Sequence, residues 1–264
     1  MDPRTRDALR ALDRRFYESC ADAFDRTRDH AWPGWERIPL PARPAGAQAL
    51  RVLDVGCGNA RFATALRGRT DRELAYTGVD QSAGMLAHAR ARLAGLRGVA
   101  FTLYETDVLD GDPDATLPEG PFDLVVAFGL LHHVPGHDTR RSLLRALARR
   151  VAPGGVLAFT AWQFADRPRF ARRIVPWPAL DAAVAGAIDP STLEPGDHLV
   201  AFGPGDAGDG GIRYAHHCDE SELDALEGGL PLRPLARFSA DGRSGDLNRY
   251  AVLGRELENG AAED

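Results

Sequence analysis

Two glycines and two acidic residues occur where apolar runs of the chain end. Asp54 lies near the end of one run, and Gly56 and Gly58 follow it closely. Glycine lets the backbone turn sharply and approach a bound ligand at points where a Cβ atom would clash. Asp80 ends the next apolar run, where a carboxylate can accept hydrogen bonds from two ribose hydroxyls. The spacing predicts a binding loop for the nucleoside part of a cofactor.

The position after this loop separates two classes of cofactor. A dinucleotide-binding loop requires a third glycine where this chain has Arg61, so that the helix can pack closely against the strand. An acid at Asp54 is also unfavourable beside a pyrophosphate, whereas it suits a ligand that carries an ammonium group. The methionine end of S-adenosylmethionine is such a ligand. The pattern therefore favours this cofactor over a nicotinamide dinucleotide.

The segment from about residue 50 to residue 162 resembles the class I S-adenosylmethionine-dependent methyltransferases. Beyond the glycine loop, the similarity includes residues 122–134 and the turn Pro153-Gly154-Gly155. The resemblance implies S-adenosylmethionine as cofactor and places Asp107 against the adenine amino group. Arg28 is a candidate partner for the methionine carboxylate, because a guanidinium binds a carboxylate through two hydrogen bonds. The candidate cofactor-binding residues are Tyr17, Arg28, Asp54, Gly56, Cys57, Gly58, Asp80, Gln81, Met85, Asp107, Val108 and Phe128.

Several segments, most of them outside this core, are similar to the tRNA wobble-uridine carboxyl-methyltransferases and their prokaryotic relatives. These segments are Tyr17, residues 24–28, Trp32-Pro33, His132-His133, Trp162-Gln163, Arg213-Tyr214 with His216, and Asn248-Arg249-Tyr250. This narrower resemblance implies methylation of the carboxylate of a modified tRNA wobble uridine. It also implies a small zinc-binding activator protein as partner.

Candidate residues for binding the methyl acceptor come mainly from the same segments. They are Trp32, Trp162, Arg213, Tyr214, His216 and Asn248. An aromatic ring can stack on a nucleoside base, although it can equally pack in the core. The other candidates would hold a carboxylate acceptor rather than remove a proton from it.

The pair His132 and His133 supplies the candidate catalytic residues. It follows a hydrophobic run, at the strand end where open α/β sheets place ligands. Either ring could act as a general base for a phenol or amine acceptor, because histidine titrates near neutral pH. A carboxylate acceptor is already ionised at pH 7 and needs no base. The alternative is that the two rings only shape the wall of the pocket.

A second histidine pair invites a metal site that its spacing does not support. His216, His217 and Cys218 are adjacent, so on a strand they cannot all face one ion. A zinc site also needs a fourth ligand, and none is evident. We predict no metal at these residues.

The composition excludes several classes of protein. The 264 residues carry a net charge of −6, and all 32 basic residues are arginine. This balance excludes a strongly basic nucleic-acid binder and leaves RNA binding to a local arginine patch. The cysteines form no paired framework, no apolar stretch is long enough for a bilayer, and the N-terminal segment lacks a signal-peptide core. We therefore expect a cytoplasmic protein without membrane contact.

Apolar runs alternate with helical patterns between residues 50 and 162, which is typical of a parallel sheet with helices on both faces. Together with the resemblance, this predicts an α/β fold with a doubly wound, seven-stranded, mostly parallel sheet whose last strand is antiparallel. We expect a single methyltransferase domain over residues 1–264. Its expected parts are an N-terminal helical lid and linker (1–45), a cofactor-binding core (50–162), an insertion after strand 5 that caps the site, partly helix and partly loop (166–211), and C-terminal strands with a helix (212–255).

Three functions remain open at this point. The first is a methyltransferase that acts on a tRNA wobble uridine, and the second is a small-molecule O- or N-methyltransferase. The third is a non-catalytic subunit that binds the cofactor and serves a partner. The acidic chain and the capping insertion favour the second, and the intact glycine loop argues against the third.

Overall fold

The computed structural model describes residues 1–27, 30–42, 49–180, 182–202 and 211–257, with only the backbone for residues 20–27 and 182–183. Its larger sheet has seven strands in the order β3-β2-β1-β4-β5-β10-β9. The strands are β1 (Ala49–Val55), β2 (Glu73–Asp80), β3 (Val99–Glu105), β4 (Phe122–Ala127), β5 (Val151–Trp162), β9 (Arg233–Ala240) and β10 (Asn248–Gly254).

The pairing confirms the predicted sheet. Strands β1 to β5 pair in parallel, whereas β10 runs antiparallel to both β5 and β9. All six residues of β4 are buried, as expected for a central strand of a sheet that helices cover on both faces.

Helices cover the two faces of this sheet with separate apolar cores. On one face, α5 (His137–Arg149) and α8 (Glu220–Glu227) pack against strand residues such as Leu53. On the other, α2 (Arg61–Arg67), α3 (Ala83–Ala94) and the 3-10 turn η1 (Pro33–Arg37) pack against residues such as Val52. Neighbouring residues of one strand enter different cores because successive side chains point to opposite faces. The short helix α4 (Pro113–Thr116) precedes β4.

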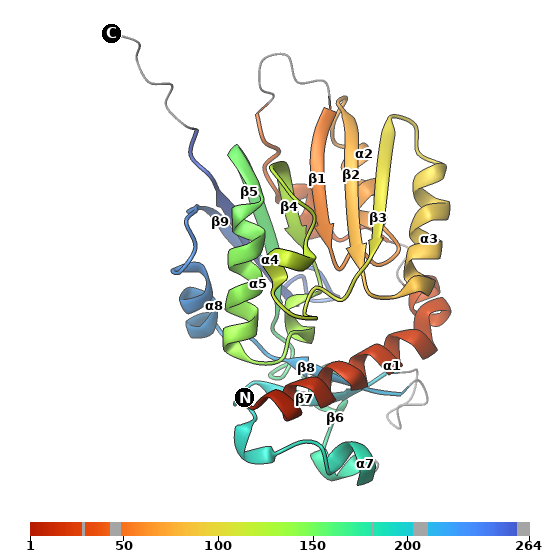
Figure 1. Ribbon diagram of the computed structural model, residues 1–264, viewed down its shortest axis with the longest axis vertical. Coiled ribbons are helices and arrows are strands. Elements are labelled where there is room, and N and C mark those ends of the chain that lie inside the picture. Colours follow the sequence, from red (N-terminus) through yellow and green to blue (C-terminus); the bar gives the residue numbers. More distant parts are fainter. Residues whose placement is uncertain (28–29, 43–48, 181, 203–210, 258–264) are drawn as a thin grey trace.

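A second, smaller sheet lies beyond the carboxyl ends of the parallel strands (Figure 1). It consists of the antiparallel strands β6 (Ile174–Val175), β7 (Asp197–Ala201) and β8 (Ile212–His216). The long helix α1 (Pro3–Thr27) packs along it, with Leu9 and Leu12 in one apolar cluster with Leu199 and Tyr214. The segment also contains α6 (Pro168–Ala171), α7 (Ala182–Ala185) and the 3-10 turns η3 (Trp177–Ala179) and η4 (Pro190–Thr192).

We call α1 together with the segment from α6 to β8 the cap. The sequence indicated helix and loop over residues 166–211, whereas this range also holds β6 and β7. The extended segment expected from residue 212 is β8, and it belongs to the small sheet rather than the large one. None of the described helices has both the length and the apolar character that a bilayer-spanning helix requires.

Candidate active site

A cavity of about 900 Å³ lies between the carboxyl ends of the parallel strands and the cap. Open α/β sheets bind their ligands at this edge. The predicted site residues that border it are Tyr17, Trp32, Asp54, Gly56, Cys57, Gly58, Asp80, Gln81, Met85, Asp107, Val108, Phe128, His132, His133, Trp162, Arg213 and Asn248. Arg28, the predicted partner of the methionine carboxylate, lies outside the described residues.

Hydrogen bonds join the loop after β1 to the end of β2. The N–H groups of Gly56 and Cys57 donate to the Val79 carbonyl at 2.8 and 3.1 Å, and the Gly58 N–H donates to Asp80 Oδ2 at 2.8 Å. Gly56 and Gly58 have φ angles of +72° and +53°, in the left-handed region that favours glycine. The loop therefore presents bare backbone to the cavity in a fixed conformation.

The carboxyl groups of Asp54, which is buried, and Asp80, which is partly buried, border the end of the cavity next to this loop. Asp54 accepts the Tyr76 hydroxyl at 2.6 Å, and Asp80 accepts backbone N–H groups from Gly58 and Ser82. Burial raises the pKa of Asp54 to about 7 and also raises the pKa of Asp80. A positively charged ligand group would stabilise the ionised form of Asp54. The two carboxylates thus fit the ammonium group and the ribose hydroxyls of S-adenosylmethionine as hydrogen-bond acceptors.

Asp107 has partners that the sequence did not reveal. Arg10 and Arg14 of α1 each donate to Asp107 Oδ2 at 2.9 Å, and the Leu109 N–H donates to Oδ1. Burial acts to raise the pKa of Asp107, but these hydrogen bonds outweigh it and hold the pKa below its ordinary value. Asp107 therefore anchors α1 to the core. Its predicted hydrogen bond with adenine stays a prediction.

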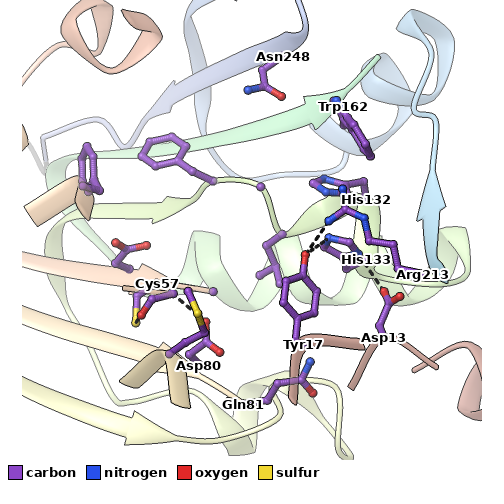
Figure 2. A pocket seen from close by; sticks show the side chains of 18 of the residues that line it. Asp13, Tyr17, Cys57, Asp80, Gln81, His132, His133, Trp162, Arg213 and Asn248 are labelled. Carbon is purple, nitrogen blue, oxygen red and sulfur yellow. Dashed lines mark hydrogen bonds and ion pairs between the residues drawn. The ribbon is translucent and has the colours of Figure 1, made fainter. Parts of the chain in front are cut away.

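The opposite end of the cavity carries a chain of polar side chains (Figure 2). The 3-10 turn η2 (Leu131–His133) follows β4 and directs His133 toward α1. The Tyr17 hydroxyl lies 2.7 Å from His133 Nε2, and Asp13 Oδ2 lies 2.8 Å from His133 Nδ1. Arg213 of β8 donates to the Tyr17 hydroxyl oxygen at 3.0 Å. Residues of the core and of both parts of the cap thus meet at His133.

Aromatic rings surround the guanidinium of Arg213. Its Cζ lies 5.3 Å from the ring centre of Trp162 and 5.5 Å from that of Phe16. The Trp162 ring also contacts His132, with ring centres 4.7 Å apart. Arg213 is only 5% exposed, and no carboxylate of the described residues forms an ion pair with it. This end of the cavity therefore combines a buried positive charge with apolar walls.

Asn248 takes part in a contact between β10 and the turn that carries Trp32. Its amide donates to Asp241 Oδ2 at 2.9 Å, and the same carboxylate accepts the Tyr250 hydroxyl and the Gly34 N–H. Trp32 stacks on Trp35 next to this turn, and both rings border the cavity. Asn248 thus positions the wall of the cavity, and its predicted contact with an acceptor stays a prediction.

Tyr214 and His216 do not border the cavity, so their position does not support the predicted role in holding an acceptor. The Tyr214 hydroxyl donates to Asp197 Oδ1 at 2.6 Å, and His216 lies between Asp197 and Glu222. Side chains alternate along β8, so Tyr214 and His216 face away from the side that Arg213 occupies.

The carboxylates around His216 are already engaged. Ligand atoms of Glu194, Asp197 and His216 lie within 4.8 Å of one another, a spacing that a metal ion could bridge. However, Arg140 forms ion pairs with both Glu194 and Glu222. The cluster is thus an ion-pair network between cap and core.

Sequence reasoning missed Arg10 and Asp13, which also border the cavity. Asp13 is 3% exposed and lies beside Leu12 within the apolar stripe of α1. A charged residue inside a buried stripe is the signal that would have identified it, because buried charges require partners. Arg10 pairs with Asp7 on the same helix and with Asp107 after β3, and no local pattern indicates the second partner.

The fold and the site together define a class of enzyme. A methyltransferase domain family matches residues 53–157. A trans-aconitate 2-methyltransferase of Methylobacterium radiotolerans is 33% identical over 225 residues, which cover 81% of this chain and 78% of that protein. A second trans-aconitate 2-methyltransferase, from Methylobacterium nodulans, is 40% identical over 153 residues, but the alignment spans only 57% of this chain and 52% of that protein. This chain belongs to the class I S-adenosylmethionine-dependent methyltransferases.

Two further comparisons are more distant. A probable tRNA methyltransferase 9B of Bos taurus is 25% identical over 166 residues, covering 61% of this chain and 32% of that protein. The solved structure of a methyltransferase from Methanosarcina mazei superimposes with a TM-score of 0.58 at 16% identity, over 86% of this chain and 99% of that one. The latter likeness shows the fold.

Proposed function

We propose that this protein transfers a methyl group from S-adenosylmethionine to a carboxylate oxygen of a small organic acid. The observation that carries the proposal is the buried guanidinium of Arg213, which borders the cavity and has no carboxylate partner among the described residues. A buried charge is unfavourable unless an opposite charge accompanies it. An acceptor carboxylate would supply that charge.

The cofactor end of the cavity suits this reaction. When bound, S-adenosylmethionine would supply a methyl group on a positively charged sulfur. A carboxylate oxygen would bond to the methyl carbon as the carbon–sulfur bond breaks, which leaves a methyl ester and the neutral thioether. Asp54 would pair with the ammonium group, and Asp80 would hold the ribose. The cap and Trp162 would exclude water and hold the acceptor in line with the methyl group, so that orientation contributes much of the acceleration. No base is required, and His132 and His133 need not remove a proton.

The relatives support a small acceptor. Both Methylobacterium proteins are named for trans-aconitate, a small polycarboxylate. The bovine relative is named as a probable tRNA methyltransferase, which supports a tRNA acceptor. The alternative is therefore the carboxylate of a modified tRNA wobble uridine, and the zinc-binding partner belongs to that alternative. The net charge of −6 and the cap over the cavity favour the small acid over a polyanion.

The experiment supplies the purified chain with methyl-labelled S-adenosylmethionine and, in separate reactions, trans-aconitate, a panel of mono- and dicarboxylic acids, and small RNA. We expect label in an organic acid, released as methanol by mild alkali because the product is an ester. RNase-sensitive label in the RNA would instead favour the tRNA alternative. Cofactor binding without transfer to any acceptor would favour a non-catalytic subunit.

A further inference from the structure

The Tyr17 hydroxyl has one hydrogen, and two polar groups of the described residues lie close to it. Arg213 Nη1 donates to its oxygen at 3.0 Å, and an arginine can only donate. His133 Nε2, at 2.7 Å, can either accept the Tyr17 hydrogen or donate a hydrogen of its own. The state of His133 therefore decides where the Tyr17 hydrogen points.

The other nitrogen of His133 is held as a donor. Nδ1 faces Asp13 Oδ2 at 2.8 Å and the Tyr214 carbonyl at 3.2 Å, and both of these atoms are acceptors. The second oxygen of Asp13 accepts the Tyr214 N–H at 2.8 Å, which fixes the orientation of the carboxylate. Because Nδ1 carries a hydrogen, the neutral ring has none on Nε2 and must accept the Tyr17 hydroxyl. Only the doubly protonated ring donates to the Tyr17 oxygen, and the Tyr17 hydroxyl hydrogen is then no longer bound to His133.

We propose that binding of an acceptor carboxylate is coupled to the uptake of one proton by His133, which turns the Tyr17 hydroxyl toward the acceptor as a donor. This inference rests on the proposed function, because the acceptor must be an anion. With His133 charged, the Tyr17 oxygen receives hydrogen bonds from both His133 and Arg213. Its own hydrogen is then available to the carboxylate oxygen that is not being methylated. Tyr17 and Arg213 both border the cavity, as such contacts require.

The charges around His133 support this exchange. Within the part of the chain that the structure describes, the groups that contact it are Asp13 and Tyr17 from α1, the Tyr214 carbonyl from β8, and the ring of His132, whose centre lies 4.1 Å away. The Tyr17 hydroxyl joins it to Arg213. Asp13 offsets a charge on the ring, but Arg213 places a second positive charge nearby. An anionic acceptor offsets that second charge and so favours the proton on His133.

Proton uptake on binding makes the affinity for the acceptor depend on pH in one direction. The acceptor complex holds one proton more than the free protein wherever His133 is neutral in the free protein. Acceptor affinity therefore falls as pH rises, and the acceptor KM increases by up to about tenfold per pH unit. The value of kcat should change little, because Tyr17 contacts the oxygen that does not react.

The experiment is calorimetry of trans-aconitate binding to the full chain saturated with S-adenosylhomocysteine. Titrations at about pH 8 in two buffers of different ionisation enthalpy give the number of protons taken up. Trans-aconitate is fully ionised there, because carboxyl groups titrate near pH 4. We expect a net uptake of protons, with one per acceptor as the upper limit, for the wild type. Glu18→Gln, which removes an exposed charge from α1 away from the cavity, should behave in the same way.

Asp13→Asn tests the direction of the hydrogen bonds. In this variant the Tyr214 N–H donates to the amide oxygen, so the amide N–H₂ group faces His133 Nδ1. Nδ1 must then accept a hydrogen bond, which places the ring hydrogen of neutral His133 on Nε2. The neutral ring then donates to Tyr17, and acceptor binding should take up no proton and lose its pH dependence. His133→Gln, which cannot titrate, should also take up no proton. The affinity for S-adenosylhomocysteine shows that each variant is folded.

Three results would overturn the inference. The first is acceptor binding to the wild type without proton uptake, and the second is proton uptake that persists in Asp13→Asn or His133→Gln. The third is a pH dependence of kcat without one of the acceptor KM, which would indicate that His133 acts as a general base. Methylation of a carboxylic acid without proton uptake refutes the coupling and leaves the proposed function intact. If no carboxylic acid is bound or methylated, both proposals fail.

Discussion

Asp54, the residue before the last of β1, has its carboxyl group inside the protein and the Tyr76 hydroxyl as its hydrogen-bond partner. Burial raises its pKa to about 7, so the fold makes ionisation of this group unfavourable near neutral pH. A ligand with an ammonium group would favour the ionised form of Asp54. The residue is thus placed to serve binding at the expense of stability.

Asp54→Asn tests this assignment. The folded pKa of about 7 lies above the ordinary 3.8, so the stability that the protonated group contributes is lost as pH rises from about 4 to about 7. The amide keeps an acceptor for Tyr76 and does not ionise. We expect the substitution to raise the unfolding temperature by several degrees at pH 8 and by less at pH 5, and to weaken S-adenosylmethionine binding by at least about tenfold. Thermal unfolding and calorimetry measure the two effects; a stability difference independent of pH would refute the assignment.

At the scale of elements, α1 joins the core to the small sheet. Its polar residues reach the core, where Arg10 and Arg14 pair with Asp107. Its apolar residues Leu9 and Leu12 pack in the cluster of the small sheet. Because Asp13 and Tyr17 lie on the same helix, the packing of Leu9 fixes where these polar groups meet His133.

Leu9→Ala should loosen this helix from the small sheet. Leu9 is fully buried, and truncation of such a residue costs about 2–5 kcal/mol. We expect a raised acceptor KM, with S-adenosylmethionine affinity changed less. Leu226→Ala on α8 is the control, because Leu226 is equally buried in the core cluster away from α1. Thermal unfolding and steady-state kinetics distinguish the two, and equal KM values in both variants would show that α1 does not set the acceptor site.

At the scale of the whole molecule, an ion-pair network holds the cap against the core. Arg140 of α5 pairs with Glu194 of the cap and Glu222 of α8, and His216 of β8 lies between Asp197 and Glu222. Burial acts to lower the pKa of His216, but the two carboxylates outweigh it and raise the pKa above 6.5. Both ring nitrogens therefore donate, and the network contains a charged histidine.

The charge of His216 predicts a pH-dependent stability. Its folded pKa is raised, so its contribution is fully present below pH 6.5 and is lost as pH rises through the folded pKa. We expect His216→Gln to lower the free energy of unfolding by about 3 kcal/mol at pH 6, and the difference from the wild type to narrow toward pH 9. Denaturant unfolding at several pH values measures this difference. A difference that stays constant with pH would show that His216 is not charged in the folded protein.

The sequence predicted the parts of the molecule that local patterns determine. Most strands of the large sheet are short, largely apolar runs, and the glycine loop is a short contiguous motif, so both were predictable. The cap was expected as helix and loop, but its small sheet and the pairing of α1 with Asp107 were not predictable, because no local pattern connects the segments that they join. Tyr214 and His216 were placed with Arg213 at the site although alternation along a strand separates them.

The central claim is that Arg213 binds the carboxylate that receives the methyl group. The most direct test is the initial rate of alkali-labile methyl ester formation from S-adenosylmethionine and trans-aconitate by the wild type and by Arg213→Gln. We predict an acceptor KM at least about tenfold higher for the variant, because one charged hydrogen bond is lost, with unchanged affinity for S-adenosylmethionine. An equal acceptor KM in the two proteins would contradict the account.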